Sequence, residues 1–258
     1  MPGQSDYAEK KSRFDRMLTV YGRKVALESL NNEALSCHTV HLADSNREHG
    51  IIAEIRRCAQ ARGIPVRVHA REALARISKN GRQDQGVAVD IECPGFRGLD
   101  DYLAEPRTRP RRLLALDGIT NPQNLGMVIR SAAAGDIDGI VLPHRGTAAL
   151  GPLVIMASAG TIYRAPLLRC ASLPAALAAL RQAGAQVCAL ASDSKDSLFE
   201  HRESDFCVYV LGNETTGVSA EVQDMSDMHL SIPMRNGVES LNVAVTASLV
   251  AFGRYFDR

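Results

Sequence analysis

The sequence predicts an α/β protein of two domains. Short apolar segments alternate with amphipathic helical segments along most of the chain. Residues 92–112 interrupt this alternation with three Pro, two Gly and five Arg, a composition typical of a linker. After the interruption the expected strands are continuously apolar, as in a parallel sheet covered by helices on both faces. We therefore expect an N-terminal arm at 1–19, a first domain at 20–93, a linker at 94–112 and a second domain at 113–258.

The composition is that of a soluble globular protein, with 258 residues of which 45% are hydrophobic and 23% charged. No apolar run approaches the roughly 18 to 20 residues that span a bilayer. The first residues are charged throughout and lack the apolar core of a secretory signal. These features favour a cytoplasmic protein.

The six cysteines are scattered, without a CxxC pair, and the seven histidines show no ligand spacing. Neither a zinc site nor a disulfide framework is suggested, and no metal is expected. Cys188 and Cys207 fall within apolar, strand-like runs, where a reduced cysteine acts as a small hydrophobic residue. A reducing compartment is the natural interpretation.

The first domain is expected to consist of helices and strands in turn. The pattern predicts helices at 25–32, 47–63 and 71–79 and strands at 39–43, 65–70 and 86–91. Six basic residues fall at helix ends and loops of this domain, where they could reach nucleic-acid phosphates or belong to ordinary solvated faces: Arg23, Lys24, Arg56, Arg57, Lys79 and Arg82.

The charge distribution gives weak support to a nucleic-acid contact in the first domain. Residues 1–97 carry 16 Lys and Arg against 12 Asp and Glu, a net charge of +4. Residues 113–258 carry 10 against 14, a net charge of −4. A basic half beside an acidic half is compatible with a nucleic-acid contact confined to one domain.

The second domain is expected to be a parallel sheet with crossover helices. Its strands are predicted at 113–116, 139–143, 165–169, 186–192, 206–212 and 230–234, and its helices at 125–137, 152–163, 173–184, 220–226 and 243–252. A short helix at 100–104 is expected within the linker.

The loop after the first strand of this sheet contains Asn121 to Gly126 and leads into a helix. We expect Asn124 to cap that helix. Arg130 lies six residues further, in an otherwise apolar run, where an arginine is usually paired or functional. The alternative is an ordinary surface arginine.

Two later loops end at the same expected edge of the sheet. The loop Gly212–Gly217 brings a carboxylate, Glu214, to a strand end. It lacks the Lys-Ser/Thr ending of a Walker loop and the GxGxxG pattern of nicotinamide-dependent oxidoreductases, which disfavours both classes. The third loop precedes the last helix and contains Ser240 and Asn242. Taken alone, that stretch is equally compatible with a covering βα unit.

Together the three loops resemble the three signature motifs of the SpoU–TrmH family of RNA ribose methyltransferases, in the SPOUT superfamily. The resemblance covers residues 113–258 and is carried by NPQNLGMVIRSAAAGDI, VLGNETTGVS and LSIPMRNGVESLNVAVTASLVAFGRY, with ASAGTIYRAPL between them. The first domain resembles the family's ribosomal-protein-like substrate-recognition domain more loosely, through YGRKVALESL and QGVAVDI. The family often has Asp at Asn121 and His at Asp84, which leaves the choice of substrate open.

The resemblance implies a trefoil-knotted α/β domain that binds S-adenosylmethionine and forms a homodimer. It implies that Gly212, Ile232, Met234 and Leu241 surround the cofactor. It also implies a catalytic set of Asn124, Arg130, Glu214, Ser240 and Asn242. In such a set Arg130 would stabilise the developing alkoxide or act as a base, and Glu214 would orient Arg130 or Asn124. We favour the electrostatic role, because a guanidinium resists deprotonation.

The expected function is S-adenosylmethionine-dependent 2′-O-methylation of RNA, most simply of 23S ribosomal RNA because a recognition domain is present. A transfer-RNA substrate is one alternative. Another is a non-catalytic RNA-binding or ribosome-assembly protein that keeps the fold. Retention of the polar residues of all three loops speaks against the second alternative.

Overall fold

The computed structural model describes residues 15–255, in two units that meet between Pro94 and Gly95. Residues 1–14, most of the expected arm, lie outside the described part of the chain. Among the described residues, no helix is long and apolar enough to cross a membrane. The two units are described separately below.

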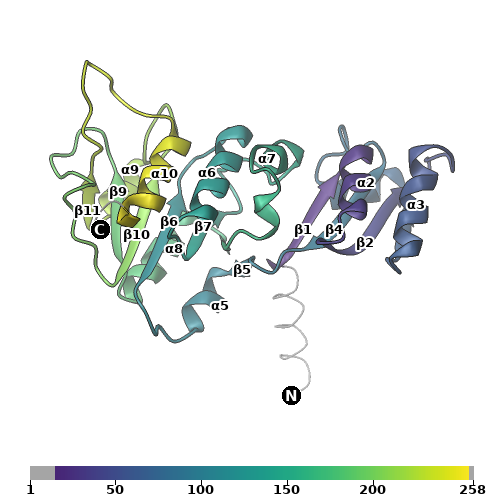
Figure 1. Ribbon diagram of the computed structural model, residues 1–258, viewed down its shortest axis with the longest axis horizontal. Helices are drawn as coiled ribbons and strands as arrows, with labels where there is room; N and C mark the ends of the chain where they lie inside the picture. The colour runs from purple at the N-terminus through teal and green to yellow at the C-terminus, as the bar shows by residue number, and fades with distance from the viewer. Residues whose placement is uncertain (1–14, 256–258) are drawn as a thin grey trace. The chain divides into compact units, whose positions relative to one another are not determined.

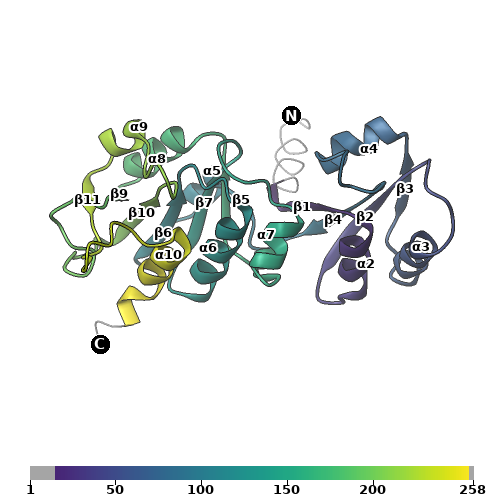
Figure 2. The ribbon, with the colours of Figure 1, turned by 90° about the horizontal axis from the view of Figure 1, so that it is seen from above.

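The N-terminal unit is a four-stranded mixed sheet with helices on both faces (Figure 1). The strand order is β1-β4-β2-β3; β4 is antiparallel to both its neighbours, and β2 and β3 are parallel. Helices α2 and α3 pack together on one face, and α4 covers the other (Figure 2). In chain order the elements are β1 (Met17–Tyr21), α2 (Arg23–Asn31), β2 (Ser36–Ala43), α3 (Ile51–Ala61), β3 (Val66–His69), α4 (Arg71–Ser78) and β4 (Val87–Glu92).

Strand β1 begins inside the segment that was expected to be an arm, so the prediction of an arm extending to residue 19 is wrong at its end. Leu18 and Val20 are buried while their neighbours are half-buried, the alternation of a strand with one face on the core. The strand pairs with β4 along its whole length. Its five residues are too few to stand out beside the charged stretch that precedes them.

The C-terminal unit is a seven-stranded sheet in the order β11-β9-β10-β6-β7-β8-β5, and every pairing is parallel. This confirms the parallel sheet predicted from the continuous apolar strands. Its strands are β5 (Arg97–Gly98), β6 (Arg111–Leu116), β7 (Gly139–Pro143), β8 (Leu167–Cys170), β9 (Gln186–Leu190), β10 (Phe206–Leu211) and β11 (Met228–Leu230). Its helices are α5 (Leu99–Ala104), α6 (Pro122–Ala134), α7 (Pro152–Ala157), α8 (Leu173–Gln182), α9 (Ala220–Asp224) and α10 (Val243–Phe252), with short 3₁₀ turns η1 (Thr161–Tyr163) and η2 (Gly253–Tyr255).

Helices cover both faces of this sheet. Helices α5, α8 and α9 lie on one face, and α6, α7 and α10 lie on the other (Figure 2). Alternate strand residues therefore point into two apolar layers; Val208 and Val210 of β10 join the α8 layer with Leu177. The strand order reverses beside β6, because β7 and β8 follow on one side of it and β10 and β9 on the other. Ligands of open α/β sheets bind at such a reversal.

The segment 94–112 is not a separate linker. Residues 97–98 form β5, which pairs with β8 at the edge of the large sheet, and α5 packs its buried Leu99 and Tyr102 into the α8 layer. The composition that predicted a linker instead reflects an edge element and an exposed turn. Arginines fit there because they stack on aromatic rings, as Arg111 does over Tyr102.

Several further elements differ from the prediction in their bounds, among them those expected at 152–163 and 230–234. The helix expected at 152–163 is broken after α7, because Ala159 and Gly160 have positive φ values of 49° and 74°. The strand expected at 230–234 is β11, which ends at Leu230 and begins two residues earlier than predicted. Beyond it Ser231 makes only an isolated bridge with Ser197, and the chain leaves the sheet.

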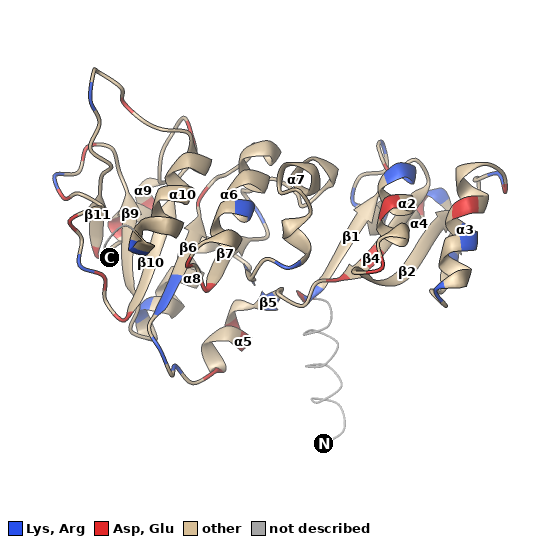
Figure 3. Cartoon of the chain, viewed as in Figure 1, with Lys and Arg blue, Asp and Glu red and all other residues tan. Residues whose placement is uncertain are grey.

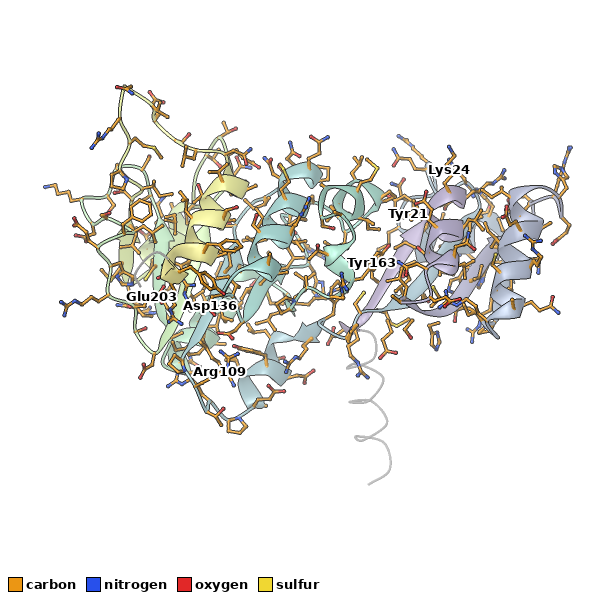
Figure 4. All side chains as sticks on the ribbon, viewed as in Figure 1. Tyr21, Lys24, Arg109, Asp136, Tyr163 and Glu203 are labelled. Carbon is orange, nitrogen blue, oxygen red and sulfur yellow. The ribbon has the colours of Figure 1, made fainter. Side chains whose placement is uncertain are left out.

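A buried arginine ties α10 and the end of α6 to the sheet. Arg112 is 2% exposed and donates to the carbonyl oxygens of Asp136 and Val250, each at 2.9 Å. Its guanidinium also pairs with Glu203 at 2.7 Å. Arg254 in turn contacts both Glu203 and Asp136, which lie close together in Figure 4. Burial alone would raise the pKa of the Glu203 carboxyl, but the Tyr209 hydroxyl and the two arginines hold it below the usual value.

Candidate active site

A pocket lies where β9, β10 and β11 end and α10 begins. Its volume is about 280 Å³. Its lining is mixed, with apolar side chains beside polar groups that include the carboxylates of Glu214 and Glu239, and no Lys, Arg or His lines it within the described part of the chain. The lining residues with side chains that bear on its chemistry are Leu190, Leu211, Glu214, Leu230, Ile232, Met234, Glu239, Ser240, Leu241, Val243 and Thr246.

Gly212 is required at the end of β10 because the chain folds back onto it. A Cβ atom at this position would lie 2.1 Å from the carbonyl carbon of Gly217 and from the amide nitrogen of Val218. Backbone atoms cannot move aside as a flexible side chain can. The amides of Asn213 and Gly217 also exchange hydrogen bonds at 2.9 Å in both directions, which closes the loop. The result is a compact turn whose backbone borders the pocket.

A hydrogen-bonded series of three polar side chains joins the three loops. The Asn124 amide nitrogen donates to the Glu214 carboxylate. The Asn242 amide nitrogen donates to the Asn124 side-chain oxygen at 3.1 Å. Asn124, the middle member, is buried, whereas Glu214 and Asn242 are exposed, and Glu214 is the member that lines the pocket. The loops expected to meet at the carboxyl edge of the sheet therefore do meet.

The caps of the two helices at this edge are not both where the sequence placed them. Helix α6 is capped by Asn121, whose side chain accepts from the amides of Gln123 and Asn124. Asn124 is thus three residues inside the helix, and the prediction that it is the cap is wrong. Pro122 at the first helical position favours this start. Asn242 caps α10 and accepts from the amide of Ala244 at 2.8 Å.

The residues that the resemblance implied for the cofactor all line the pocket. They are Gly212, Ile232, Met234 and Leu241. Ile232 and Met234 are half-buried because the chain leaves the sheet after β11 and passes along the pocket wall. Ser240 also lines the pocket and is exposed there.

Arg130 is not joined to this group. It is exposed on α6 and has no hydrogen bond or ion pair within the described part of the chain. It follows Asn124 by six residues, which in a helix is about 9 Å along the axis and about 120° around it. Glu214 contacts Asn124 and not Arg130. The apolar run around Arg130 is explained by its neighbours, since Val128 and Ile129 face the core.

Two residues of the site were not anticipated. The Asn213 side chain accepts from the amides of Thr215 and Thr216 and donates to the carbonyl of Gly118 at 2.8 Å. It therefore holds the β10 loop against the β6 loop. An Asn followed by polar residues and a Gly is the sequence signal of such a turn. Glu239 supplies the second carboxylate of the pocket, and its place in a polar loop gave no comparable signal.

No cluster that could hold a metal ion borders this pocket within residues 15–255. The hydrogen-bonded series instead presents amide and carboxylate groups beside a pocket with both apolar and polar lining. Such a site can bind a positively charged ligand that has apolar and polar parts, and can position a hydroxyl group beside it.

Family models match both units of the chain. Residues 111–252, more than half of the sequence, match the model described as the SpoU rRNA Methylase family. The chain belongs to the SpoU rRNA methylase family. Residues 19–95 match a second model, described as RNA 2'-O ribose methyltransferase substrate binding. The resemblance inferred from the three motifs is thereby confirmed, and the chain is an RNA 2′-O-ribose methyltransferase of the SpoU family with its substrate-binding domain at the N-terminus.

Relatives of the SpoU chain match it over most of its length. A protein of Mycolicibacterium vanbaalenii named as an uncharacterized tRNA/rRNA methyltransferase is 34% identical over 235 residues, which cover 90% of this chain and 74% of the relative. A protein of the same description from Mycobacterium leprae is 32% identical over 248 residues, covering 96% of this chain and 80% of the relative.

Solved structures support the fold of the SpoU chain. An AdoMet-bound rRNA methyltransferase from Sinorhizobium meliloti superposes with a TM-score of 0.63 at 22% identity, covering 98% of this chain and 91% of that structure. A structure described as a putative RNA methyltransferase of the TrmH family, from Porphyromonas gingivalis, gives a TM-score of 0.59 at 25% identity, covering 92% and 89%. The methyltransferase AviRb from Streptomyces viridochromogenes, in complex with AdoMet, gives 0.62 at 19% identity, covering all of this chain and 94% of that structure.

Proposed function

We propose that this protein transfers the methyl group of S-adenosylmethionine to a ribose 2′-hydroxyl of ribosomal RNA. The observation that carries the proposal is the hydrogen-bonded side-chain series Glu214–Asn124–Asn242, which reaches the pocket through Glu214. The pocket suits the donor because a sulfonium is cationic and the rim holds two carboxylates, Glu214 and Glu239. Two of the similar solved structures are described as AdoMet-bound.

In this reaction the protein has mainly to align the ribose hydroxyl with the methyl group and to stabilise the charge that develops on the oxygen. The sulfonium methyl is already electrophilic, whereas a ribose hydroxyl is a poor nucleophile until its proton is stabilised or removed. In our scheme the ribose oxygen attacks the methyl carbon, the carbon–sulfur bond breaks, and the hydroxyl proton leaves to water or a neighbouring base. The neutral thioether S-adenosylhomocysteine is the product.

The polar residues have separate roles in this scheme. Glu214 orients the Asn124 amide, and Asn124 in turn fixes Asn242 at the start of α10. Ser240 is exposed in the pocket lining, Asn242 is exposed two residues further on, and both hold the ribose or its phosphate. Arg130 is exposed and unpaired within the described residues, so it is available to an RNA phosphate or to the developing alkoxide.

The N-terminal unit supplies the contact with RNA in this proposal. Lys24, Lys79 and Arg82 are exposed and have no hydrogen bond or ion pair within residues 15–255. They flank the hydrogen bond of Asn80 to the Tyr21 hydroxyl, at 2.9 Å, which joins the end of β1 to the loop after α4. Figure 4 shows Tyr21 and Lys24 on neighbouring elements. Figure 3 marks in blue the Lys and Arg positions on the helices and loops of this unit.

The other three of the six basic residues singled out in the sequence are engaged within the protein. Arg56 pairs with Glu48 and Arg57 with Glu54. The Arg23 guanidinium donates to the Asn46 side chain and to the Gln85 carbonyl. Lys24, Lys79 and Arg82 have no such bonds within residues 15–255, and we propose that these three side chains contact RNA phosphates.

We further propose a homodimer formed through the face covered by α6, α7 and α10. Apolar side chains are exposed on each of these helices: Met127, Leu153, Met156 and Val245 are between 38% and 75% exposed. Exposed apolar groups of this size on neighbouring helices favour association. The trefoil knot likewise remains a proposal; it would be made where the chain returns from β11 to pack α10 against α6. Sedimentation of the purified protein tests the dimer, and a monomer at micromolar concentration would contradict it.

Mapping of 2′-O-methyl sites tests the proposed function most directly. Ribosomal and transfer RNA from cells with and without this protein would be compared by mass spectrometry. Loss of one or a few 2′-O-methyl nucleotides from ribosomal RNA is expected. Loss confined to transfer RNA would correct the substrate. No loss, together with no binding of S-adenosylmethionine by the folded protein in calorimetry, would favour a non-catalytic RNA-binding or assembly role.

A further inference from the structure

Three side chains from two strands and the segment between them meet in the C-terminal unit, and none of them lines the methyl-donor pocket. Cys188 of β9 and Cys207 of β10 are both fully buried, and their sulfur atoms are 3.7 Å apart. The Nε2 atom of His201 lies 3.8 Å from the Cys188 sulfur. All three potential ligand atoms lie within 4.8 Å of one another.

We propose that Cys188, His201 and Cys207 bind one Zn²⁺ ion. Zinc takes thiolate ligands at about 2.3 Å and imidazole nitrogens at about 2.0 Å in tetrahedral geometry. Two thiolates in that geometry stand about 3.8 Å apart, and a thiolate and an imidazole nitrogen about 3.5 Å apart. The observed 3.7 Å and 3.8 Å separations match these values to within a few tenths of an ångström.

The ligands come from a rigid support. Cys188 and Cys207 lie on adjacent strands, in which Cys188 pairs with Tyr209, so both point to the same face of the sheet. This is the face opposite the α8 layer, because Val187 and Val208 face that layer. Strands in the middle of a seven-stranded sheet hold their side chains more precisely than loops do.

His201 is held by anchors on both sides although its segment has no regular structure. On one side, the Leu198 amide donates to the Ser231 carbonyl at 2.8 Å. On the other, Glu203 binds the Tyr209 hydroxyl and two arginines. The His201 ring lies edge-on to Tyr209, at 6.3 Å between ring centroids. The imidazole is therefore placed over the two cysteines before any ion binds.

The environment favours a neutral complex with one open position. Two thiolates and one Zn²⁺ carry no net charge, which a buried site requires. His201 lines two cavities, of about 470 Å³ and about 360 Å³. Each has room for the water that would complete the tetrahedron. Thiolate and imidazole donors favour zinc over the hard cations Mg²⁺ and Ca²⁺.

Two plainer accounts of the cluster differ from a zinc site in what they predict. A disulfide requires sulfur atoms about 2.05 Å apart and leaves His201 without a role. Reduced thiols that make weak hydrogen bonds to each other and to the imidazole would bind no metal, which the experiments below test. The site could not be recognised from the sequence. His201 follows Cys188 by 13 residues and precedes Cys207 by 6, and neither spacing is the short CxxC spacing of common zinc motifs.

Metal analysis of the full-length protein tests the proposal. Protein purified under reducing conditions with zinc in the medium is expected to hold about one zinc per chain by mass spectrometry. Cys188→Ser and His201→Gln are each expected to lower zinc affinity by at least 10-fold. Cys170→Ser, which changes a half-buried cysteine outside the cluster, is the matched control and should keep its zinc.

A second measurement needs no variant. Metal-free wild-type protein titrated with Co²⁺ should develop a thiolate-to-cobalt charge-transfer band near one equivalent, and zinc should remove it. Three results would overturn the proposal: no zinc and no cobalt band after dialysis with reductant, zinc retained by both Cys188→Ser and His201→Gln, or a Cys188–Cys207 disulfide in the protein as isolated. None of these depends on methyl transfer, so the outcome is independent of the proposed function.

Discussion

The side-chain amide of Asn124 donates a hydrogen bond to the carboxylate of Glu214, which lies 90 residues further along the chain. The oxygen of the same amide accepts from Asn242. With one neighbour that only accepts and one that donates, the orientation of the Asn124 amide is fixed. Five predictions follow from this and related contacts.

Replacing Glu214 should separate the effect of its charge from that of its hydrogen bond. Glu214→Ala removes the acceptor for Asn124, and we expect turnover to fall on the order of 100-fold because the polar side chains are no longer oriented. Glu214→Gln keeps an acceptor oxygen and should lose less. Transfer of labelled methyl groups to RNA measures turnover, and calorimetry with S-adenosylmethionine measures binding. Wild-type turnover in Glu214→Ala would remove this residue from the site.

Arg130→Ala should abolish most activity without affecting the fold. The side chain is exposed and unpaired within residues 15–255, so stability should change by less than about 0.5 kcal/mol. Loss of a cation that stabilises a developing alkoxide or binds a phosphate should lower turnover by roughly 100-fold or more. Arg181→Ala, an exposed arginine of α8 that pairs with Asp227, is the control and should stay active. Full turnover in Arg130→Ala would exclude it from the mechanism.

Gly212→Ala should prevent donor binding. The added methyl would lie 2.1 Å from backbone atoms of the same loop, so the loop must open and the pocket wall must shift. We expect no detectable heat with S-adenosylmethionine in calorimetry. Gly253→Ala is the matched control, because its φ of −51° suits alanine and no atom lies within 4 Å of the new methyl. Equal donor affinity in both variants would contradict the assignment of this loop.

Charge reversal at Lys24 and Lys79 should weaken RNA binding and leave donor binding intact. Each lost phosphate contact should also reduce the salt dependence of binding. The slope of the logarithm of the binding constant against the logarithm of salt concentration should become less steep by about one unit. The double variant Lys24→Glu with Lys79→Glu would be compared with Lys195→Glu in the C-terminal unit. RNA affinity measured at several salt concentrations is the readout. If both proteins bind RNA alike, these lysines do not contact it.

Acid should destabilise the N-terminal unit by protonating the carboxylate of Asp84. This carboxylate is fully buried and accepts from Arg71 at 2.6 Å, Ser78 at 2.7 Å and the Gly86 amide at 2.9 Å. Burial alone would raise the pKa of Asp84, but these hydrogen bonds and the Arg71 charge lower it. A lowered pKa contributes stability above the unfolded value of about 3.9, and that stability is lost as pH falls through the folded value.

The corresponding variant is Asp84→Asn. It should cost about 2 kcal/mol at neutral pH, because Arg71 loses a charged partner. Below about pH 4, the stability of the variant should also fall less steeply with pH than that of the wild type. Hydrogen exchange of peptides from β4 measures the effect, with peptides from β10 as an internal reference. A pH profile that the variant leaves unchanged would show that another group governs acid unfolding.

Long apolar periodic segments were predicted well from the sequence. Strand β7 and helix α10 have the predicted bounds, because continuous apolar strands and small-residue helices carry a strong local signal. Short elements such as β1 and β5 were missed, since two to five residues at a sheet edge are stabilised by pairing partners that are distant in sequence. The knot had no signal in periodicity and was implied only by the resemblance.

For the site, sequence motifs predicted which loops would meet, and the structure shows how. The hydrogen-bonded series of Asn124, Glu214 and Asn242 could not be derived from spacing, because it depends on the strand order around β6. The same holds for the cluster of Cys188, His201 and Cys207. Both arrangements are products of tertiary contacts rather than of local pattern.

The position of α10 has a consequence for synthesis of the protein. The helix cap Asn242 and the wall residues Val243 and Thr246 complete a pocket whose other sides come from residues made much earlier. A nascent chain that ends before Thr246 therefore cannot enclose a methyl donor, however well its first domain has folded. On the ribosome, the capacity to engage RNA can precede the capacity to modify it.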